Sequence, residues 1–251
     1  MDVIKRNFKG LYLFSLGYVL FRALGLYLTT TPLVEDVGAL MCVGLIYLIL
    51  SAIIYTGFQW YILNICRNNE NEHIFKTIGN NSGWIIILSI VKDIVMRMLL
   101  MVIGIFIGFI WGAVSQTGIL ENILEIYIAE MVTALFAFTE FIYYDKKDRG
   151  PLRAVFDSIK TTRKVYGKVF FIHLFILLYD VIVIIYAEIA KKNMSLGNVL
   201  FISAFVWMFA VYPLCYVKLC KIYNSVKKEE SEINDSLTVV ARALDDEMNK
   251  K

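Results

Sequence analysis

The segment WIIILSIVKDIVMRMLLMVIGIFIGFIWGAV, residues Trp84 to Val114, decides the fold class of this chain. An α-helix needs about 20 apolar residues to cross the hydrocarbon of a bilayer, and this segment is longer. It also carries Lys92, Asp93 and Arg97 near its middle, where ionised side chains are costly in lipid. The segment therefore predicts a membrane-spanning helix whose charged side chains need partners or water.

The rest of the chain has the same character. Its 251 residues are 59% hydrophobic and only 19% charged, which is too apolar for a soluble domain with a polar surface. Six apolar runs are long enough to span a membrane, at residues 11–30, 38–64, 84–114, 119–144, 169–190 and 197–220. We therefore expect an all-α polytopic membrane protein, with six transmembrane helices arranged as three hairpins in one domain, residues 1–222. The first run has no convincing cleavage site after it, so we expect it to be retained.

The distribution of basic residues predicts the orientation of the spans. Lysines and arginines gather at the N-terminus, in the second and fourth connections and in the C-terminal tail, whereas only Lys191 and Lys192 fall in the connections on the other side. Basic connections stay in the cytoplasm, so we expect both termini there and a multi-pass protein of a bacterial cytoplasmic membrane. The net charge of +3 then reflects this orientation, and no nucleic-acid partner is expected.

Cytoplasmic amphipathic helices are expected to precede two of the spans. Gly150-Pro151 is a favourable helix start, and apolar residues follow at helical spacing among basic ones. The apolar set is Leu152, Val155, Phe156 and Ile159, and the basic set is Arg153, Lys160, Arg163 and Lys164. Aligning Phe75 with Phe156 predicts a repeat of about 80 residues, consisting of such a surface helix and a hairpin.

The tail, residues 223–251, predicts a further amphipathic helix. Its apolar residues recur every three or four positions, at Ile233, Leu237, Val240, Leu244 and Met248. This helix could dock on the cytoplasmic face of its own chain, bind a partner helix or pair with a second copy. Docking on its own chain is the interpretation we favour.

Two segments carry a resemblance to a known group of proteins. TGFQWYILNICRNNENEHIFKTIG, Thr56 to Gly79, ends a span and enters a surface helix, and RAVFDSIKTTRKVYGKVFFIHLFILLY, Arg153 to Tyr179, repeats the theme. They resemble an uncharacterised family of bacterial six-helix integral membrane proteins and, more distantly, the membrane domain of some glycerophosphodiester phosphodiesterases. The resemblance implies a six-helix membrane fold and supplies no catalytic residue. The soluble phosphodiesterase domain is not expected, since the chain after Lys221 is too short to hold it.

Ionisable residues recur near the middle of the predicted spans and predict a polar network between the helices. Its members are Arg22, Lys92, Asp93, Arg97, Glu130, His173 and Asp180. Asp93 and Arg97 share a helical face with Gly104 and Gly108, and Gly112 lies just beyond it. Because small residues at this spacing allow close helix packing, we expect this face to point into the bundle. Lys92 lies about 100° away from it, and the sequence leaves open whether Lys92 meets protein, water or headgroups.

The same network admits two uses. It could fix the register and rotation of the helices as buried ion pairs, or it could mark a pathway for protons or a substrate. Pro213 could kink the sixth span. The sequence has no metal-binding, serine-hydrolase or nucleotide-binding motif, so we expect neither an enzyme nor a cofactor. His173 is expected to be a packed or hydrogen-bonded side chain rather than a proton relay.

These features favour a non-enzymatic membrane protein. We expect a small transporter, or the membrane subunit of an export or envelope system whose basic cytoplasmic helices could receive a partner such as an ATPase subunit. Two alternatives stay open: an immunity protein that blocks a membrane-active toxin or bacteriocin, and a purely structural membrane scaffold.

Overall fold

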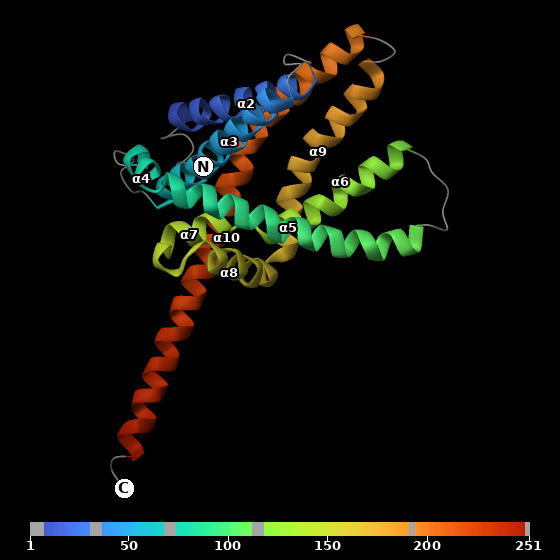
Figure 1. Ribbon diagram of the computed structural model, residues 1–251. Helices are drawn as coiled ribbons and strands as arrows, with labels where there is room; N and C mark the ends of the chain where they lie inside the picture. The colour runs from blue at the N-terminus through green and yellow to red at the C-terminus, as the bar shows by residue number, and fades with distance from the viewer. Residues whose placement is uncertain (1–7, 31–36, 68–73, 112–117, 191–193, 249–251) are drawn as a thin grey trace.

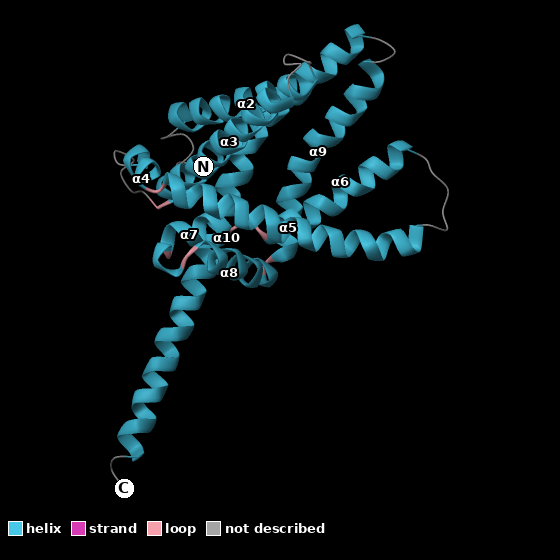
Figure 2. Cartoon of the chain, viewed as in Figure 1, coloured by secondary structure: helices cyan, strands magenta, loops and turns pink. Residues whose placement is uncertain are grey.

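The protein is built from helices in all the parts that a computed structural model describes, residues 8–30, 37–67, 74–111, 118–190 and 194–248 (Figures 1 and 2). No strand occurs among these residues, which confirms the predicted all-α class. The long helices are α2 (Phe8–Thr30), α3 (Val37–Cys66), α5 (Ser82–Trp111), α6 (Gly118–Leu135), α9 (Tyr166–Ala190) and α10 (Met194–Met248). The short ones are α4 (Ile74–Asn80), α7 (Thr139–Asp145), the 3-10 turn η1 (Lys147–Arg149) and α8 (Pro151–Lys164).

Three stretches of the described chain are long and apolar enough to cross a membrane. They are Met41–Cys66 in α3, Ile126–Asp145 across α6 and α7, and Phe205–Ile233 in α10. Helix α5 has 30 residues and is apolar as well, but it carries three charged residues in its middle. The structure therefore supports a multi-pass membrane protein, while the number of six spans stays a prediction.

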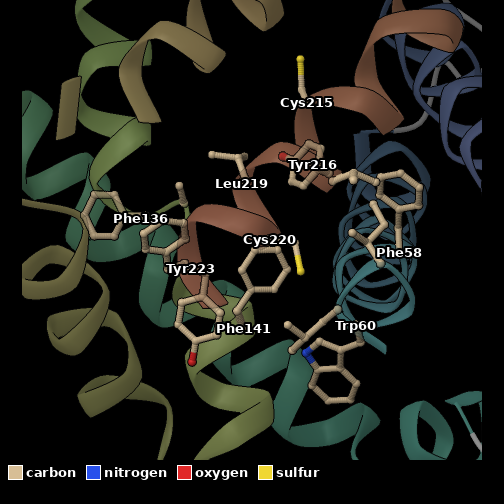
Figure 3. Close-up of a cluster of buried hydrophobic side chains, with 14 of the residues drawn as sticks. Phe58, Trp60, Phe136, Phe141, Cys215, Tyr216, Leu219, Cys220 and Tyr223 are labelled. Atoms are coloured by element: carbon tan, nitrogen blue, oxygen red, sulfur yellow. The ribbon is translucent and has the colours of Figure 1, made fainter. Parts of the chain in front are cut away.

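The buried core lies where α3, α7 and α10 meet. Figure 3 shows this cluster, in which Phe58 and Trp60 of α3 face Tyr216 and Tyr223 of α10 and Phe141 of α7. Each of these aromatic side chains is at least nine-tenths buried. Burial of large aromatic side chains contributes most to packing energy, so this end of the molecule holds the helices together.

Elsewhere the outer faces of the helices expose large apolar side chains. Met41 on α3 is 72% exposed, Met101 on α5 is 69% exposed, and Ile202 on α10 is 61% exposed. An exposed apolar surface of this extent is unfavourable in water and favourable against lipid tails. The exposed faces thus agree with the composition in pointing to a membrane.

Helix α8 begins where the sequence predicts it, and small side chains form most of the face that it turns toward the protein. Gly150 has a φ of 77° and Pro151 takes the first helical position. Small side chains such as Ala154 and Ser158 are buried, whereas Leu152 and Phe156 are 54% and 55% exposed. Close contact of α8 with α5 and α7 uses these small side chains. The exposed Leu152 and Phe156 stay available to lipid, so the predicted membrane-surface position of this helix stays a prediction.

The fourth predicted span, residues 119–144, is interrupted. Helix α6 ends at Leu135 and α7 begins at Thr139, with tight backbone bonds such as Phe136 N–H to Thr133 C=O at 2.9 Å between them. The hydroxyl of Ser158 in α8 bridges the break: Phe138 N–H donates to it at 3.2 Å, and it donates to the Leu135 carbonyl at 3.2 Å. Backbone groups left free at the break are thus paired inside the protein, as an apolar environment requires.

The sixth predicted span and the tail form one helix. Helix α10 runs for 55 residues through Pro213, and its last turns project away from the other helices (Figure 1). Lys164 of α8 binds Glu230 at 2.6 Å, but Ile233, one turn further on, is 59% exposed. The tail beyond this point does not fold back on the body, so the interpretation that it docks on its own chain is wrong. Continuous helical hydrogen bonding carries it straight past the expected boundary at residue 223.

The bridge at Ser158 provides a test of the interrupted span. We expect Ser158→Ala to lower the free energy of unfolding by about 1–3 kcal/mol, because it leaves a buried N–H and a buried carbonyl without partners. Thermal unfolding in detergent measures this. Thr162→Val on the same buried face is the matched control, since the Thr162 hydroxyl has no hydrogen-bond partner among the described residues. Equal effects of the two substitutions would contradict a role for the bridge.

Candidate functional site

A buried ion pair joins α5 to the short helix α7. The ammonium group of Lys92 binds the Oε1 atom of Glu140, and the two side chains are 14% and 2% exposed. Trp60 of α3 fixes the backbone at this point by donating from Nε1 to the Glu140 carbonyl at 3.0 Å. Glu140 is the second residue of α7, so the helix break places its carboxylate against α5.

One tyrosine contacts the lysine, and further tyrosines extend from it into the core. The Lys92 ammonium lies 4.7 Å from the centre of the Tyr55 ring, within range of a favourable cation–π interaction. The Tyr55 hydroxyl is 2.8 Å from the Tyr216 hydroxyl, which accepts a further bond from Tyr212 at 3.3 Å. Tyr18 of α2 stacks on Tyr212 with a centroid distance of 5.0 Å. Hydrogen-bonded hydroxyl groups therefore link α3 to α10 beside the ion pair, which contacts the ring of Tyr55.

Several buried polar atoms lack hydrogen-bond partners among the described residues, and they belong to Glu140 itself or to residues that lie near the site residues along the chain. They are the second carboxylate oxygen of Glu140, the Thr139 hydroxyl and both polar atoms of the Gln59 side chain. Gln59 is fully buried and lies one helical turn after Tyr55 on the same face of α3. Unpaired buried polar atoms are rare in folded proteins and commonly bind water or a polar ligand. These atoms are therefore the candidates in this part of the protein for bonds to water or to a small polar ligand.

The inner face of α5 differs from the one expected. Ile85 and Leu88 are buried and lie on the same side of the helix as Lys92. Arg97 is exposed, and among the described residues it forms no ion pair with Asp93. A side chain added at Gly104 would meet no atom within 4 Å. The expected inward position of Arg97 is therefore wrong. Lys92, whose surroundings the sequence leaves open, lies about 100° around the helix from Asp93 and meets a buried carboxylate.

The other predicted network members are placed only in part. His173 of α9 is 4% exposed, and its Nδ1 atom lies 3.0 Å from the Glu130 carboxylate of α6, so these two residues do meet. Arg22 and Asp180 lie in α2 and α9, but their side chains are outside the described residues. The predicted convergence of four helices on one network therefore stays a prediction.

Two further packing predictions concern glycine and proline. The Gly108 position lies in α5 but beyond the residues whose surroundings are described, and Gly112 lies outside the described residues altogether. Pro213 is buried within α10, and the helix continues on both sides of it. A role of these residues in helix packing or gating stays a prediction.

A second polar cluster lies where the ends of α3 and α7 meet the middle of α10. Asp145 accepts hydrogen bonds from Arg67 at 2.6 and 2.9 Å, from the Tyr223 hydroxyl at 2.7 Å and from Lys227 at 2.8 Å. Its hydrogen bonds with Arg67 raise the pKa of that guanidinium, while partial burial lowers the pKa of nearby Lys147. The Asp145 carboxylate thus accepts hydrogen bonds from residues of two other parts of the chain. Charge-assisted bonds of this kind are typical of a group that holds helices together.

Glu140 is the residue that the sequence analysis missed. It falls near the end of the fourth apolar run, where a charged residue is expected to meet the headgroups. The signal that could have found it is the segment FAFTEF, residues 136–141, in which a lone carboxylate stands among aromatic residues. An acid in such surroundings needs a buried partner, and Lys92 was the cation without one.

Comparisons with other proteins add no identification. The sequence matches no protein-family model, no curated protein sequence and no solved structure. Within the described part of the chain, no group of three or more histidine, cysteine, aspartate or glutamate side chains could hold a metal ion. The geometry of the Lys92–Glu140 site therefore carries the functional argument.

Substitutions at the ion pair test its contribution to stability. We expect Lys92→Met to lower the free energy of unfolding by about 3–5 kcal/mol, because it leaves the Glu140 carboxylate buried and unpaired. The double variant Lys92→Met/Glu140→Gln removes both charges, so its loss is expected to be much smaller.

Thermal unfolding in detergent compares these variants, with Arg97→Met as the matched control. Arg97 is a cation of the same helix that is exposed and has no ion pair among the described residues, so its replacement is expected to change the free energy of unfolding by less than about 0.5 kcal/mol. A double variant as unstable as Lys92→Met alone would show that charge pairing is not what the site contributes.

Proposed function

We propose that this chain is a six-span protein of a bacterial cytoplasmic membrane that acts without a catalytic centre, as a small transporter or as the membrane subunit of an export or envelope system. The observation that carries the proposal is the Lys92–Glu140 pair, with its unpaired carboxylate oxygen, beside a broken helix. Ionisable residues in spans commonly mark the path of an ion or substrate. Interrupted helices place binding sites in many transporters.

Exposed side chains on α8 support the proposal that this helix lies on the cytoplasmic side of the membrane. Leu152 and Phe156 are exposed next to Arg153, Lys160 and Arg163, which are exposed as well. Apolar and basic side chains side by side suit the boundary between lipid tails and anionic headgroups. The same basic residues could receive a cytoplasmic partner subunit.

A purely structural role is the second candidate, and the Asp145 cluster favours it. Four donor groups from Arg67, Tyr223 and Lys227 surround that carboxylate, so part of the polar interior of this protein serves to fix helices. In this alternative the Lys92–Glu140 pair fixes α5 against α7 in the same way. The two roles differ in whether water reaches the pair.

Accessibility to aqueous reagents separates the two roles. In a variant without native cysteines, we expect Gln59→Cys to react with a membrane-impermeant methanethiosulfonate from at least one side, because a transport pathway must admit water to the unpaired polar atoms. Leu63→Cys, which replaces a fully buried side chain one turn further along α3, is the protected control. Protection of both positions from both sides would exclude the pathway and leave the structural role.

The six-span topology has its own test. We expect a cysteine introduced at Ser236, in the projecting part of α10, to be labelled only from the cytoplasmic side. A cysteine at Lys192, which lies outside the described residues, is expected to be labelled only from the opposite side, because an odd number of spans separates it from the N-terminus. Labelling of both positions from the same side of intact cells would contradict the proposed arrangement.

A further inference from the structure

One face of α8 is open to its surroundings. Six of its side chains are exposed, and by helical geometry they lie within an arc of about 120°. They are Leu152, Arg153, Phe156, Lys160, Arg163 and Lys164. The other side of the helix packs on the protein and carries the buried side chains of Ala154, Val155, Ser158 and Thr162. We call the exposed side of α8 the open face.

The open face is divided lengthwise into an apolar edge and a basic edge. Leu152 and Phe156 lie one helical turn apart on the apolar edge. Arg153 and Lys160 lie about 70° further round the helix, and Arg163 adds a third cation in the last turn. This division is typical of a helix that lies in a membrane surface, with one edge against the lipid tails and the other among the headgroups.

Most of the positive charge on the open face has no negative partner in the protein. Lys164 is paired with Glu230, and Asp157, the acidic residue of α8, is paired with Arg149 at 3.8 Å. The cations of α8 that form no ion pair within the described part of the chain are Arg153, Lys160 and Arg163. The open face therefore presents unpaired positive charge next to apolar side chains.

An anionic phospholipid matches both edges, because its acyl chains are apolar and its headgroup is negative. The chain also continues from α8 into a surface that lipid would cover: α9 begins at Tyr166 and exposes Phe171 and Phe175. Figure 1 shows α8 at the end of the body from which the last turns of α10 project, where a membrane surface is expected. A soluble protein partner would match the positive charge but not the continuity with α9.

The buried side of the same helix completes the break between α6 and α7. Ser158 lies about 180° round the helix from the middle of the open face. Its hydroxyl bridges the Phe138 N–H and the Leu135 carbonyl at the break. Helix α8 also packs on α5 and α7, which carry the Lys92–Glu140 pair. A ligand that holds the open face in place would therefore also hold the hydroxyl that pairs the free backbone groups.

We propose that the open face of α8 binds anionic phospholipid through Arg153, Lys160 and Arg163, and that the bound lipid holds α8 against the break between α6 and α7. This goes further than a position of α8 near the headgroups, because it requires negative charge on the lipid. It does not depend on transport: lipid binding and stability are measured on a protein that need not transport anything, so the two proposals fail separately.

Native mass spectrometry of the full-length protein measures the binding. The protein in a neutral detergent is titrated with phosphatidylglycerol or with zwitterionic phosphatidylcholine, and we expect tighter binding of phosphatidylglycerol. Each of the substitutions Arg153→Gln, Lys160→Gln and Arg163→Gln is expected to weaken that binding about fivefold. The α8 triple variant combines all three. The matched control Lys9→Gln/Lys221→Gln/Lys228→Gln removes the same charge from exposed positions of α2 and α10 and is expected to bind like the wild type.

Thermal unfolding in lipid nanodiscs tests the effect on the break. Phosphatidylglycerol added to phosphatidylcholine is expected to raise the melting temperature of the wild type and of the control triple variant, and to leave that of the α8 triple variant unchanged. Ser158→Ala is expected to lose most of this increase, because α8 is then no longer joined to the break. Thr162→Val is expected to keep it.

Three results would overturn the proposal. Equal binding of the two lipids by the wild type would show that lipid charge is not recognised. Equal losses in the two triple variants would show a general effect of charge. An α8 triple variant that binds phosphatidylglycerol as tightly as the wild type would leave the open face to a protein partner. A Ser158→Ala variant that keeps the full increase in melting temperature would overturn the link between lipid and break.

Discussion

The ion pair between Lys92 and Glu140 constrains the arrangement of α3, α5 and α7. Neither charge can be buried alone, because transfer of an unpaired ion from water to an apolar interior is far more costly than any single packing contact. The pair therefore fixes which face of α5 turns inward. It also requires α7 to begin where it does, since Glu140 reaches α5 only from the first turn of that helix. Trp60 then ties the same turn to α3.

The interruption between α6 and α7 follows from this constraint. An unbroken helix would carry Glu140 further along the axis of α6, whereas the break redirects the chain and needs new partners for its free backbone groups. Ser158 supplies them with one hydroxyl that both donates and accepts. Small residues on the buried face of α8 allow this hydroxyl to approach the break closely. The polar site and the packing of α8 thus depend on each other.

The sequence is sufficient to predict the helices and insufficient to predict their faces. Hydropathy locates the first residue of each long helix within a few positions, because length and composition alone determine which segments can cross lipid. It does not predict the end of α10, which continues past the apolar residues to Met248. It does not predict the break at 136–138, since Phe136, Ala137 and Phe138 are as apolar as a continuous span. The face of α5 was wrongly assigned because Asp93 and Arg97 offered a pairing within one helix, and the preferred partner of Lys92 lies 48 residues away. Pairings between distant segments are set by tertiary packing, which periodicity does not contain.

The distribution of exposed apolar side chains bears on how water could reach the Lys92–Glu140 pair. The core of Phe58, Trp60 and Tyr216 closes one end of the molecule, whereas Met98 and Met101 on α5 expose apolar side chains that lipid would cover. Dispersion contacts with lipid tails hold helices less firmly than an interlocked core does. Separation of Lys92 from Glu140 would have to break both the ion pair and the packing of Ile85 and Leu88, which are buried on the same side of α5. Water entering between the two charges would lower the electrostatic part of that cost by solvating both groups, and would leave the packing part unchanged.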